Sequence, residues 1–357
     1  MVVEDRLKAV VRALSEGFPR RHVWQPEQLA GACGYVEGLL AQACGRAVER
    51  QLFTARFWAD SRGARVEHLE CVNLAVDLPG TEKPERILIV GAHYDSRVGM
   101  RMQQGTVPCF EWDGVPEAAR CYQDTPGAND NASGVAALVA LAEMLAAEPL
   151  PITVRLVSWA NEEYPFFRNR WAKPATHPSC DVFFADGMGS FQHARRCVAA
   201  GESIVGVLAL DTLGCYRQDP DYVVEGYPAW KRAVLRRIFP SGGDYVAFMS
   251  NRRSRRFLRQ VHAHYTAVGT VPAIRRSFPL MDTLKVGWSD DWAYWQFGIP
   301  GLIVTDTAYI RSCHYHRVTD TADRLDYPET AKVVLSLGQA IPRTCAQLAG
   351  RVARLSA

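Results

Sequence analysis

Four short apolar runs constrain the fold of this chain more than any other feature of its sequence. They are RILIVGAHYDS from Arg86, ITVRLVSWA from Ile152, IVGVLALD from Ile204 and GIPGLIVTD from Gly298, and each gives way abruptly to polar residues. Near-continuous apolar runs are typical of strands buried on both faces. Because helical patterns alternate with these runs, we predict an α/β fold with three layers, in which helices cover both faces of a largely parallel sheet.

The rest of the chain is predicted to complete one catalytic domain over residues 1–357. Helical patterns fill residues 1–45, two further strands are expected at 48–59 and 71–78, a helix should begin at Ser133, and a last helix should run from Tyr327 to Leu348. Insertions interrupt the pattern at about 97–127, 168–187 and 216–285. Loops of that length in a compact domain usually form the walls or lids of a functional site.

Composition excludes several classes of partner. A net charge of +3 and a pI near 8.3 are too mild to indicate nucleic acid or an anionic membrane as the main partner. No stretch approaches the roughly 20 apolar residues that cross a bilayer, and the N-terminus reads as an amphipathic helix rather than a secretory signal. Ten cysteines without a CxxC pair indicate reduced thiols. We therefore expect a cytoplasmic protein of unspecified oligomeric state.

Polar residues that suit metal binding follow the predicted strands. In such sheets the residues beyond the carboxyl ends of the strands share one edge, where ligands bind. The residues placed there are His93, Asp95, Asp130, Glu162, Glu163, Asp211 and His316. Histidines and carboxylates without thiolates fit a catalytic zinc pair, with one carboxylate bridging the metals.

Each of these residues has a plainer interpretation when taken alone. A histidine at a strand end commonly makes an ordinary hydrogen bond, and an aspartate after a strand commonly caps a helix or occupies a turn. Asp130 stands among Gly127, Asn129 and Asn131, a composition typical of a turn. The metal hypothesis depends on the combination, because several separate strand or helix ends would each have to supply a ligand type to the same edge by accident.

The motifs in combination resemble one family, the dizinc aminopeptidases related to bacterial leucine aminopeptidases, with glutamate carboxypeptidases and glutaminyl cyclases as wider relatives. The resemblance covers about residues 70–340 and rests on GAHYDS, PGANDNASGVAAL, NEE, ALDTLG, SDDWAYW and YHRVTDTADRLDY, which occur in the family's order. It implies a zinc-exopeptidase fold of the phosphorylase/hydrolase-like type, with a mixed, mostly parallel sheet. It also implies a peptide substrate and two zinc ions per chain.

The resemblance assigns a role to each residue at the predicted edge. His93 and Asp211 would complete one zinc site, Glu163 and His316 the other, and Asp130 would bridge both. Asp95 would orient His93, since histidine ligands usually donate their second ring nitrogen to a carboxylate.

Glu162 and Glu163 are adjacent, yet the resemblance gives them different roles. Glu162 would be the general base and Glu163 a zinc ligand. Side chains of neighbouring residues on a strand point to opposite faces, so both can reach one site only if the backbone turns, and Pro165 is consistent with a turn. Tyr315 matches a family position whose hydroxyl can stabilise the oxyanion, and its plainer interpretation is a packing tyrosine.

The leading hypothesis is a zinc aminopeptidase that uses an attacking water and a glutamate base. The first alternative is a glutaminyl cyclase, which shares most of the ligand residues but uses one zinc. The second alternative is a binding module on a degenerate peptidase fold, although such modules would be expected to lose ligands that are all present here. Ligand counting does not separate the peptidase from the cyclase.

Weaker signals remain. The segment 168–187 departs from the family pattern and is expected to influence specificity, and His177 and His193 beside it are expected at the surface. The arginine-rich segment 251–260 predicts a solvated helix face, with a subunit contact or acidic-peptide docking as alternatives. Trp288, Trp292 and Trp295 fit either a substrate pocket or the core.

Overall fold

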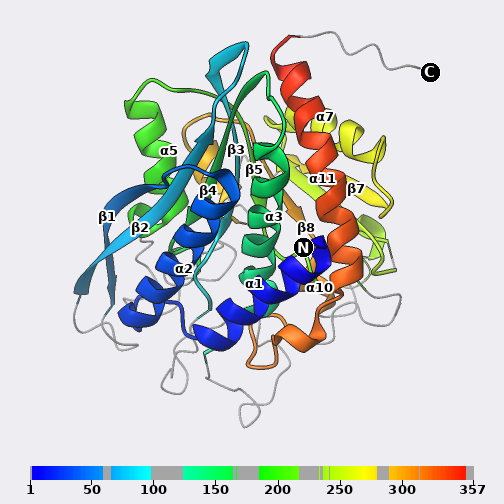
Figure 1. Ribbon diagram of the computed structural model, residues 1–357. Coiled ribbons are helices and arrows are strands. Elements are labelled where there is room, and N and C mark those ends of the chain that lie inside the picture. Colours follow the sequence, from blue (N-terminus) through cyan, green and yellow to red (C-terminus); the bar gives the residue numbers. More distant parts are fainter. Residues whose placement is uncertain are drawn as a thin grey trace.

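A single eight-stranded sheet forms the centre of the protein (Figure 1). The computed structural model describes residues 2–58, 66–97, 124–163, 166, 185–216, 233, 236–240, 242–279, 289–312 and 314–350. The strand order is β1-β2-β4-β3-β5-β8-β6-β7. The strands are β1 Glu49–Trp58, β2 Val66–Leu78, β3 Lys83–His93, β4 Ile152–Trp159, β5 Ser203–Leu210, β6 Val246–Asn251, β7 Ala273–Phe278 and β8 Gly301–Thr305.

The sheet is mixed, with a parallel centre. Strands β4, β3, β5 and β8 run parallel to one another, while β2 pairs antiparallel with β4 and β1 antiparallel with β2. At the other end β6 is antiparallel to β8, and β7 is parallel to β6. The predicted mixed, mostly parallel sheet is confirmed. All four central parallel strands present their carboxyl ends to one edge.

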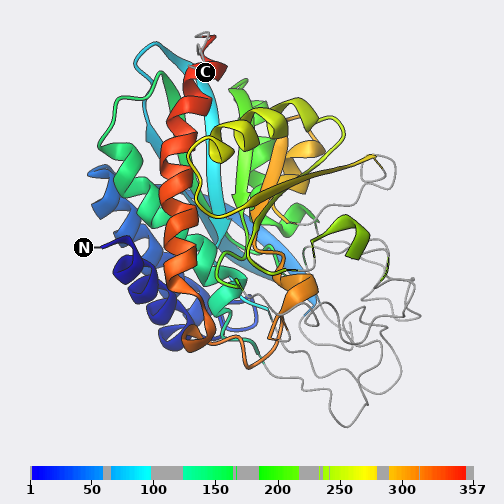
Figure 2. The same cartoon turned by 90° about the vertical axis from the view of Figure 1, so that its right-hand side faces the viewer.

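Helices cover both faces of the sheet (Figures 1 and 2). One layer packs around α3 and α11, and the other packs on β2, β5 and β8. The first layer comprises α1 Val3–Gly17, α2 Pro26–Cys44, α3 Gly134–Ala146, α7 Arg255–Thr266 and α11 Tyr327–Leu348; the second comprises α5 Gly189–Ala199 and α9 Asp291–Trp295. Short helical turns lie at η3 Ala128–Ser133, η4 Ala185–Gly187, α10 Ala308–Arg311 and η6 Ala322–Arg324. The predicted three-layer arrangement is therefore confirmed.

Hydrophobic periodicity explains why these segments take these forms. Leu7, Val10, Val11 and Leu14 recur at helical spacing in α1, and all four are buried. In β3 every residue from Ile87 to His93 is buried, as expected for a strand with helices on both sides. Of the six described cysteines, five are buried and none forms a disulfide within the described part of the chain. Among the described helices, none is long and apolar enough to cross a membrane.

The prediction that 216–285 is an insertion into the pattern was wrong for its second half. Strands β6 and β7 and helix α7 all lie there, and both strands belong to the central sheet. The signal was weak because β7 reads AIRRSF, in which two arginines interrupt the apolar run. The predicted insertion 168–187 lies outside the described residues except for 185–187, as does most of 97–127.

Candidate metal centre

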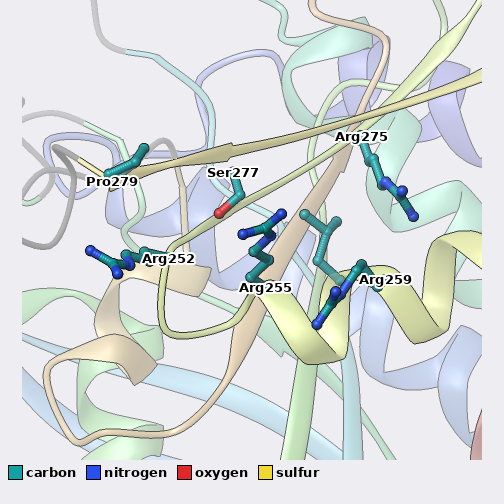
Figure 3. A pocket seen from close by; sticks show the side chains of 7 residues that line it. Arg252, Arg255, Arg259, Arg275, Ser277 and Pro279 are labelled. Carbon is teal, nitrogen blue, oxygen red and sulfur yellow. The ribbon is translucent and has the colours of Figure 1, made fainter.

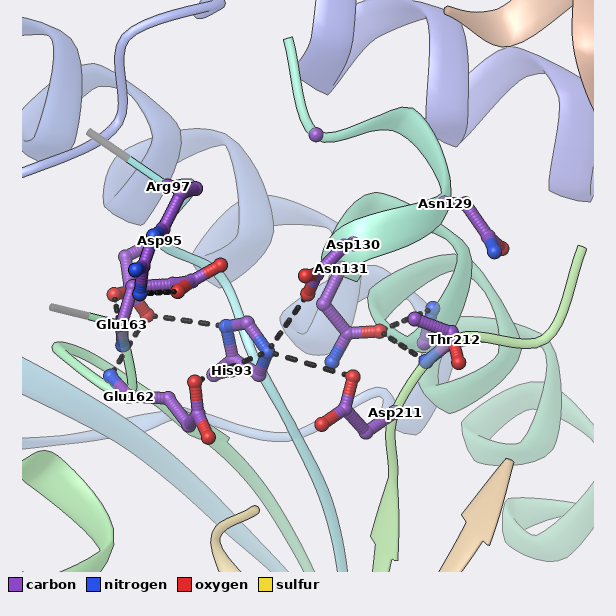
Figure 4. A network of polar contacts seen from close by, with 12 residues as sticks. His93, Asp95, Arg97, Asn129, Asp130, Asn131, Glu162, Glu163, Asp211 and Thr212 are labelled. Atoms are coloured by element: carbon purple, nitrogen blue, oxygen red, sulfur yellow. Dashed lines mark hydrogen bonds and ion pairs between the residues drawn. The ribbon is translucent and has the colours of Figure 1, made fainter. Parts of the chain in front are cut away.

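The seven residues predicted to share one edge of the sheet come together there. His93 is the last residue of β3, and the Glu162–Glu163 pair and Asp211 directly follow β4 and β5. Asp130 lies in η3, just before α3, and His316 lies beyond α10. Figure 4 shows the His93 ring between Asp95 on one side and Asp130 and Asp211 on the other.

Five of these seven side chains form two groups of three with Asp130 as the common member. Ligand atoms of His93, Asp130 and Asp211 lie within 4.8 Å of one another, and so do those of Asp130, Glu163 and His316. His93 Nε2 is 3.5 Å from Asp130 Oδ1 and 3.7 Å from Asp211 Oδ1. His316 Nε2 is 2.8 Å from Asp130 Oδ2 and 3.4 Å from Glu163 Oε1. The two oxygens of Asp130 therefore face the two histidines separately.

Asp95 links His93 to the two glutamates. Its Oδ1 lies 3.2 Å from His93 Nδ1 and accepts the backbone N–H of Glu162 at 3.1 Å, while its Oδ2 accepts the backbone N–H of Glu163 at 3.0 Å. This contact fixes which ring nitrogen of His93 faces the metal group. One carboxylate thus orients the histidine and holds the glutamate turn in place.

The turn that brings both glutamates to the site begins at Asn161. Its φ of 61° is left-handed, a conformation that asparagine tolerates better than most residues. The Asn161 side chain donates to the carbonyl of Gly187 at 3.1 Å, which holds the turn against η4. Pro165, which is consistent with a turn near the glutamates, lies outside the described residues.

Asp130 is held by a carboxylate for which the sequence analysis gave no role. Asp320 accepts the backbone N–H groups of Asn129 and Asp130 at 2.8 and 3.0 Å. Ser133, expected to start the helix, does precede α3, but its hydroxyl donates to the carbonyl of Asn129 and accepts the N–H of Leu213 instead of capping the helix. The segment around Asp130 is thereby tied to the loops after β5 and after α10.

Arg21, between α1 and α2, clamps two loops of the site together. It is fully buried, and its guanidinium donates to five backbone carbonyls: those of Leu14, Phe18, Tyr94, Pro126 and Gly127. Gly127 has a φ of 60°, and a Cβ there would lie 2.4 Å from the carbonyl oxygen of Asp130 and 2.9 Å from Arg21 Nη2. The clamp joins the loop that carries Asp95 to the segment that carries Asp130.

Burial and crowding shift the proton affinities at the site. Burial alone would lower the pKa of His93, but the carboxylates of Asp130, Asp211 and Asp95 outweigh it and raise this pKa well above 6.5. Burial would raise the pKa of Asp130, yet the two facing histidines lower it below its usual range. Burial also raises the pKa of Glu162 well above 4.5, with Glu163 and Asp211 adding to the effect and His93 opposing it.

The residues present fit a bound metal. His93 Nε2 and Glu163 Oε1 are buried without a hydrogen-bond partner among the described residues, although each lies 3.4 to 3.9 Å from other potential ligand atoms. Buried polar atoms are normally satisfied. Unsatisfied nitrogen and oxygen donors that face a common point have the chemistry of a zinc site with positions left open for water.

Tyr315 and the weaker signals also have definite positions. The Tyr315 ring stacks on the His316 ring with centroids 3.8 Å apart. Trp292 and Trp295 pack in the core, whereas Trp288 and His177 lie outside the described residues. The prediction that His193 lies at the surface was wrong: it is 1% exposed on α5, with Nδ1 2.7 Å from the hydroxyl of Tyr294.

Three residues beside the centre received no role from sequence reasoning. Asp320 and Asp290 stand inside the quoted motifs YHRVTDTADRLDY and SDDWAYW, so their place there was an available signal. Burial raises the pKa of each carboxyl to about 7. Arg21 carried no signal, because its partners lie up to 106 residues away in the chain.

Comparisons with known proteins identify the family of the chain. Residues 73–340, more than half of the chain, match the model of peptidase family M28. The Escherichia coli K12 protein YfbL is 32% identical over 262 residues, which make up 73% of this chain and 68% of that protein.

Solved structures share the fold. The glutaminyl cyclase of Fimbriiglobus ruber superposes with a TM-score of 0.65 at 21% identity, covering 95% of each chain. A Zn-dependent exopeptidase from Parabacteroides distasonis superposes with a TM-score of 0.62 at 15% identity, covering 96% of this chain and 97% of that one. The fold is the one shared by these zinc-dependent exopeptidase and glutaminyl cyclase structures. The chain belongs to peptidase family M28.

Proposed function

We propose that this protein is a zinc-dependent aminopeptidase that binds two metal ions and releases the N-terminal residue of peptides. The observation that carries the proposal is the sharing of Asp130 between two complete groups of three donors. Each group supplies one histidine and two carboxylates, and this donor set suits a catalytic zinc ion.

Two zinc ions held by these groups would supply a water of lowered pKa and a polarised scissile carbonyl. His93, Asp130 and Asp211 would hold one ion, and Asp130, Glu163 and His316 the other. Arg97 donates to Glu163 Oε2 at 3.1 Å, which leaves Oε1 of that carboxylate as the ligand atom.

Glu162 is the candidate general base. It is buried, its Oε2 lies 3.9 Å from His93 Nε2, and it belongs to neither group of three donors. Its raised pKa makes it a stronger proton acceptor than an exposed glutamate. Glu162 would take the proton of the attacking water and deliver it to the leaving amine, while the Asp95 carboxylate, which accepts the backbone N–H of Glu162, holds it in position.

Tyr315 is the candidate donor to the oxyanion. Its stacking on His316 places its ring beside the second group of donors. A hydroxyl positioned in this way would stabilise charge that develops on the carbonyl oxygen. Tyr315→Phe should therefore lower kcat more than it raises KM, since the interaction forms only in the transition state.

One panel of substrates tests the proposal. Zinc-loaded protein is assayed with aminoacyl amides, with peptides that begin with glutamine, and with acidic dipeptides, and products are identified by mass spectrometry. Release of free amino acids from the amides is the expected result. Conversion of the glutaminyl peptides to pyroglutamyl products, with no hydrolysis of the amides, would instead identify a cyclase.

A further inference from the structure

The segment 245–279 carries a concentrated positive charge that the metal centre does not use. It contains seven arginines and no aspartate or glutamate, whereas the whole chain carries a net charge of only +3. Five of the seven lie in α7 and the turn before it, and the other two lie in β7. The rest of the chain is therefore net acidic, and this segment forms a distinct basic region.

Three of these arginines, in α7 and the turn before it, line one hollow. Arg255 and Arg259 lie one turn apart on the same face of α7, and Arg252 lies in the turn before the helix. They meet β7 across a hollow of about 500 Å³ (Figure 3). The residues that line the hollow are Arg252, Arg255, Leu258, Arg259, Arg275, Ser277 and Pro279. Arg253 and Arg256 are not among the lining residues.

Three of the arginines around the hollow lack an acidic partner among the described residues. Arg255, Arg259 and Arg275 are exposed, and in the described part of the chain none of the three forms an ion pair. Arg276, by contrast, points away and donates to the carbonyl of Ile238 at 2.6 Å. Guanidinium groups held together without acidic partners repel one another, and an anion between them relieves that repulsion.

The hollow lies far from the metal centre. Strand β6 is antiparallel to β8, so its start, Val246, lies near the metal edge and its end, Asn251, lies at the opposite end of the sheet. The six residues of β6 span roughly 17 Å at the usual rise of a strand. A peptide bound for hydrolysis at the metals would not need this hollow. A ligand of these arginines would therefore be a different molecule from the peptide substrate.

We propose that the hollow is a binding site for a small anion with two or more linked phosphate groups. Arginine forks match phosphate oxygens and bind them through charge-assisted hydrogen bonds. Guanidinium groups on α7 and β7 flank the hollow from two elements, which suits a ligand with charge at more than one point. A volume of about 500 Å³ is within the range of small-molecule sites.

Calorimetric titration with tripolyphosphate at about 0.15 M salt tests this site. Wild-type protein is compared with Arg255→Gln/Arg259→Gln and with the matched control Arg253→Gln/Arg256→Gln, which removes the same charge from the same basic segment at residues that do not line the hollow. We expect roughly tenfold weaker binding or more in the first variant, and a change within about twofold in the control. Both variants keep the metal centre, so any binding of the probe there contributes equally to both.

Arginine footprinting with phenylglyoxal locates the contact independently. Tripolyphosphate should protect Arg255, Arg259 and Arg275 while leaving Arg253 and Arg256 reactive. If tripolyphosphate binding were weakened equally in both variants, it would depend on the overall charge of the segment and not on the hollow. That result would overturn the proposed site. The proposal would also fail if wild-type protein bound no tripolyphosphate at millimolar concentration, or if an oligoglutamate peptide bound in the hollow more tightly than tripolyphosphate did.

Discussion

The metal centre and the arginine hollow lie at opposite ends of one sheet and differ in how their charges are satisfied. At the metal centre His93 is 0% exposed and Asp130 is 4% exposed, and protein donors hold the surrounding carboxylates. At the hollow the arginines project into solvent, which screens them. Buried charge must be matched atom by atom, whereas exposed charge is tolerated without partners.

The contrast predicts where substitutions have large effects. A change at the metal centre leaves a buried group unmatched and disturbs several partners together. A change at the hollow alters a solvated surface and should affect only a bound anion.

Replacement of the shared carboxylate should have the largest effect. Asp130→Asn weakens both groups of donors, since only Asp130 faces both histidines, so zinc content should fall from two equivalents toward zero and activity should be lost. His93→Ala should remove mainly one equivalent. Elemental analysis and titration calorimetry measure both. Loss of a single, independent zinc in each variant would contradict the sharing of Asp130.

The adjacent glutamates should separate a proton acceptor from a ligand. Glu162→Gln should lower kcat by roughly 10²–10⁴-fold at unchanged zinc content, because an amide does not accept the proton of the water. Glu163→Gln should lose or weaken one zinc and regain part of its activity as zinc is raised. The reverse pattern, with rescue by zinc in Glu162→Gln alone, would exchange the two roles.

A smaller effect is expected where a residue acts through a ligand. Asp320→Asn replaces an oxygen that accepts an N–H with an amide group that is itself a donor, so the support of Asp130 is weakened. Zinc affinity should fall by roughly 10–100-fold, as for other partners of metal ligands. Asp323→Asn, three residues away and exposed, is the matched control and should leave zinc affinity unchanged.

His193 tests the cost of burying a titratable group that forms no ion pair with the described acidic residues. Burial lowers its pKa from 6.5 to about 3, so between these values the unfolded state binds a proton that the native state does not. Its contribution to stability is therefore complete above pH 6.5 and declines as the pH falls, by at most about 1.4 kcal/mol per pH unit. Denaturant unfolding of wild type and His193→Gln from pH 7 to pH 4 should show a shallower decline in the variant. Parallel pH profiles would refute the assignment.

The hollow should give the smallest change in stability. Arg255 and Arg259 are like charges four residues apart, so Arg255→Gln/Arg259→Gln should leave the free energy of unfolding within about 0.5 kcal/mol of wild type or raise it slightly. The measurement is thermal unfolding in dilute salt without added anion. A loss of several kcal/mol would mean that these arginines have structural partners and would remove the contrast with the metal centre.

Local sequence pattern was sufficient to predict the parallel centre of the sheet and the residues at its edge. The four apolar runs became β3, β4, β5 and β8, and the last helix runs from Tyr327 to Leu348 as expected. The residue type of His93, at the end of a strand, and of Asp130, before a helix, indicated metal-binding chemistry. The resemblance of the motifs then ordered them into a metal centre, whose individual roles stay predictions until tested.

Features that depend on distant contacts were not visible in the sequence. The motif YHRVTDTADRLDY marked Asp320 as a residue of interest, but its contact with the backbone of Asp130, 190 residues away, was not visible in any local pattern. Strand β7 was missed because its arginines mask the apolar alternation, and its place in the sheet depends on pairing with β6. The turn at Asn161 depends on a hydrogen bond from its side chain to the carbonyl of Gly187, which lies well beyond it in the chain.

The clamp made by Arg21 bears on which segments of the chain the metal centre requires. Helices α1 and α2 contain none of the candidate ligands, yet Arg21 between them binds the loop of Asp95 and the segment of Asp130. A proteolytic nick or an affinity tag that displaces Arg21 would be expected to loosen the metal centre while sparing every ligand. We therefore expect a fragment cut to the region of the ligands, without the first two dozen residues, to hold its metal centre less firmly.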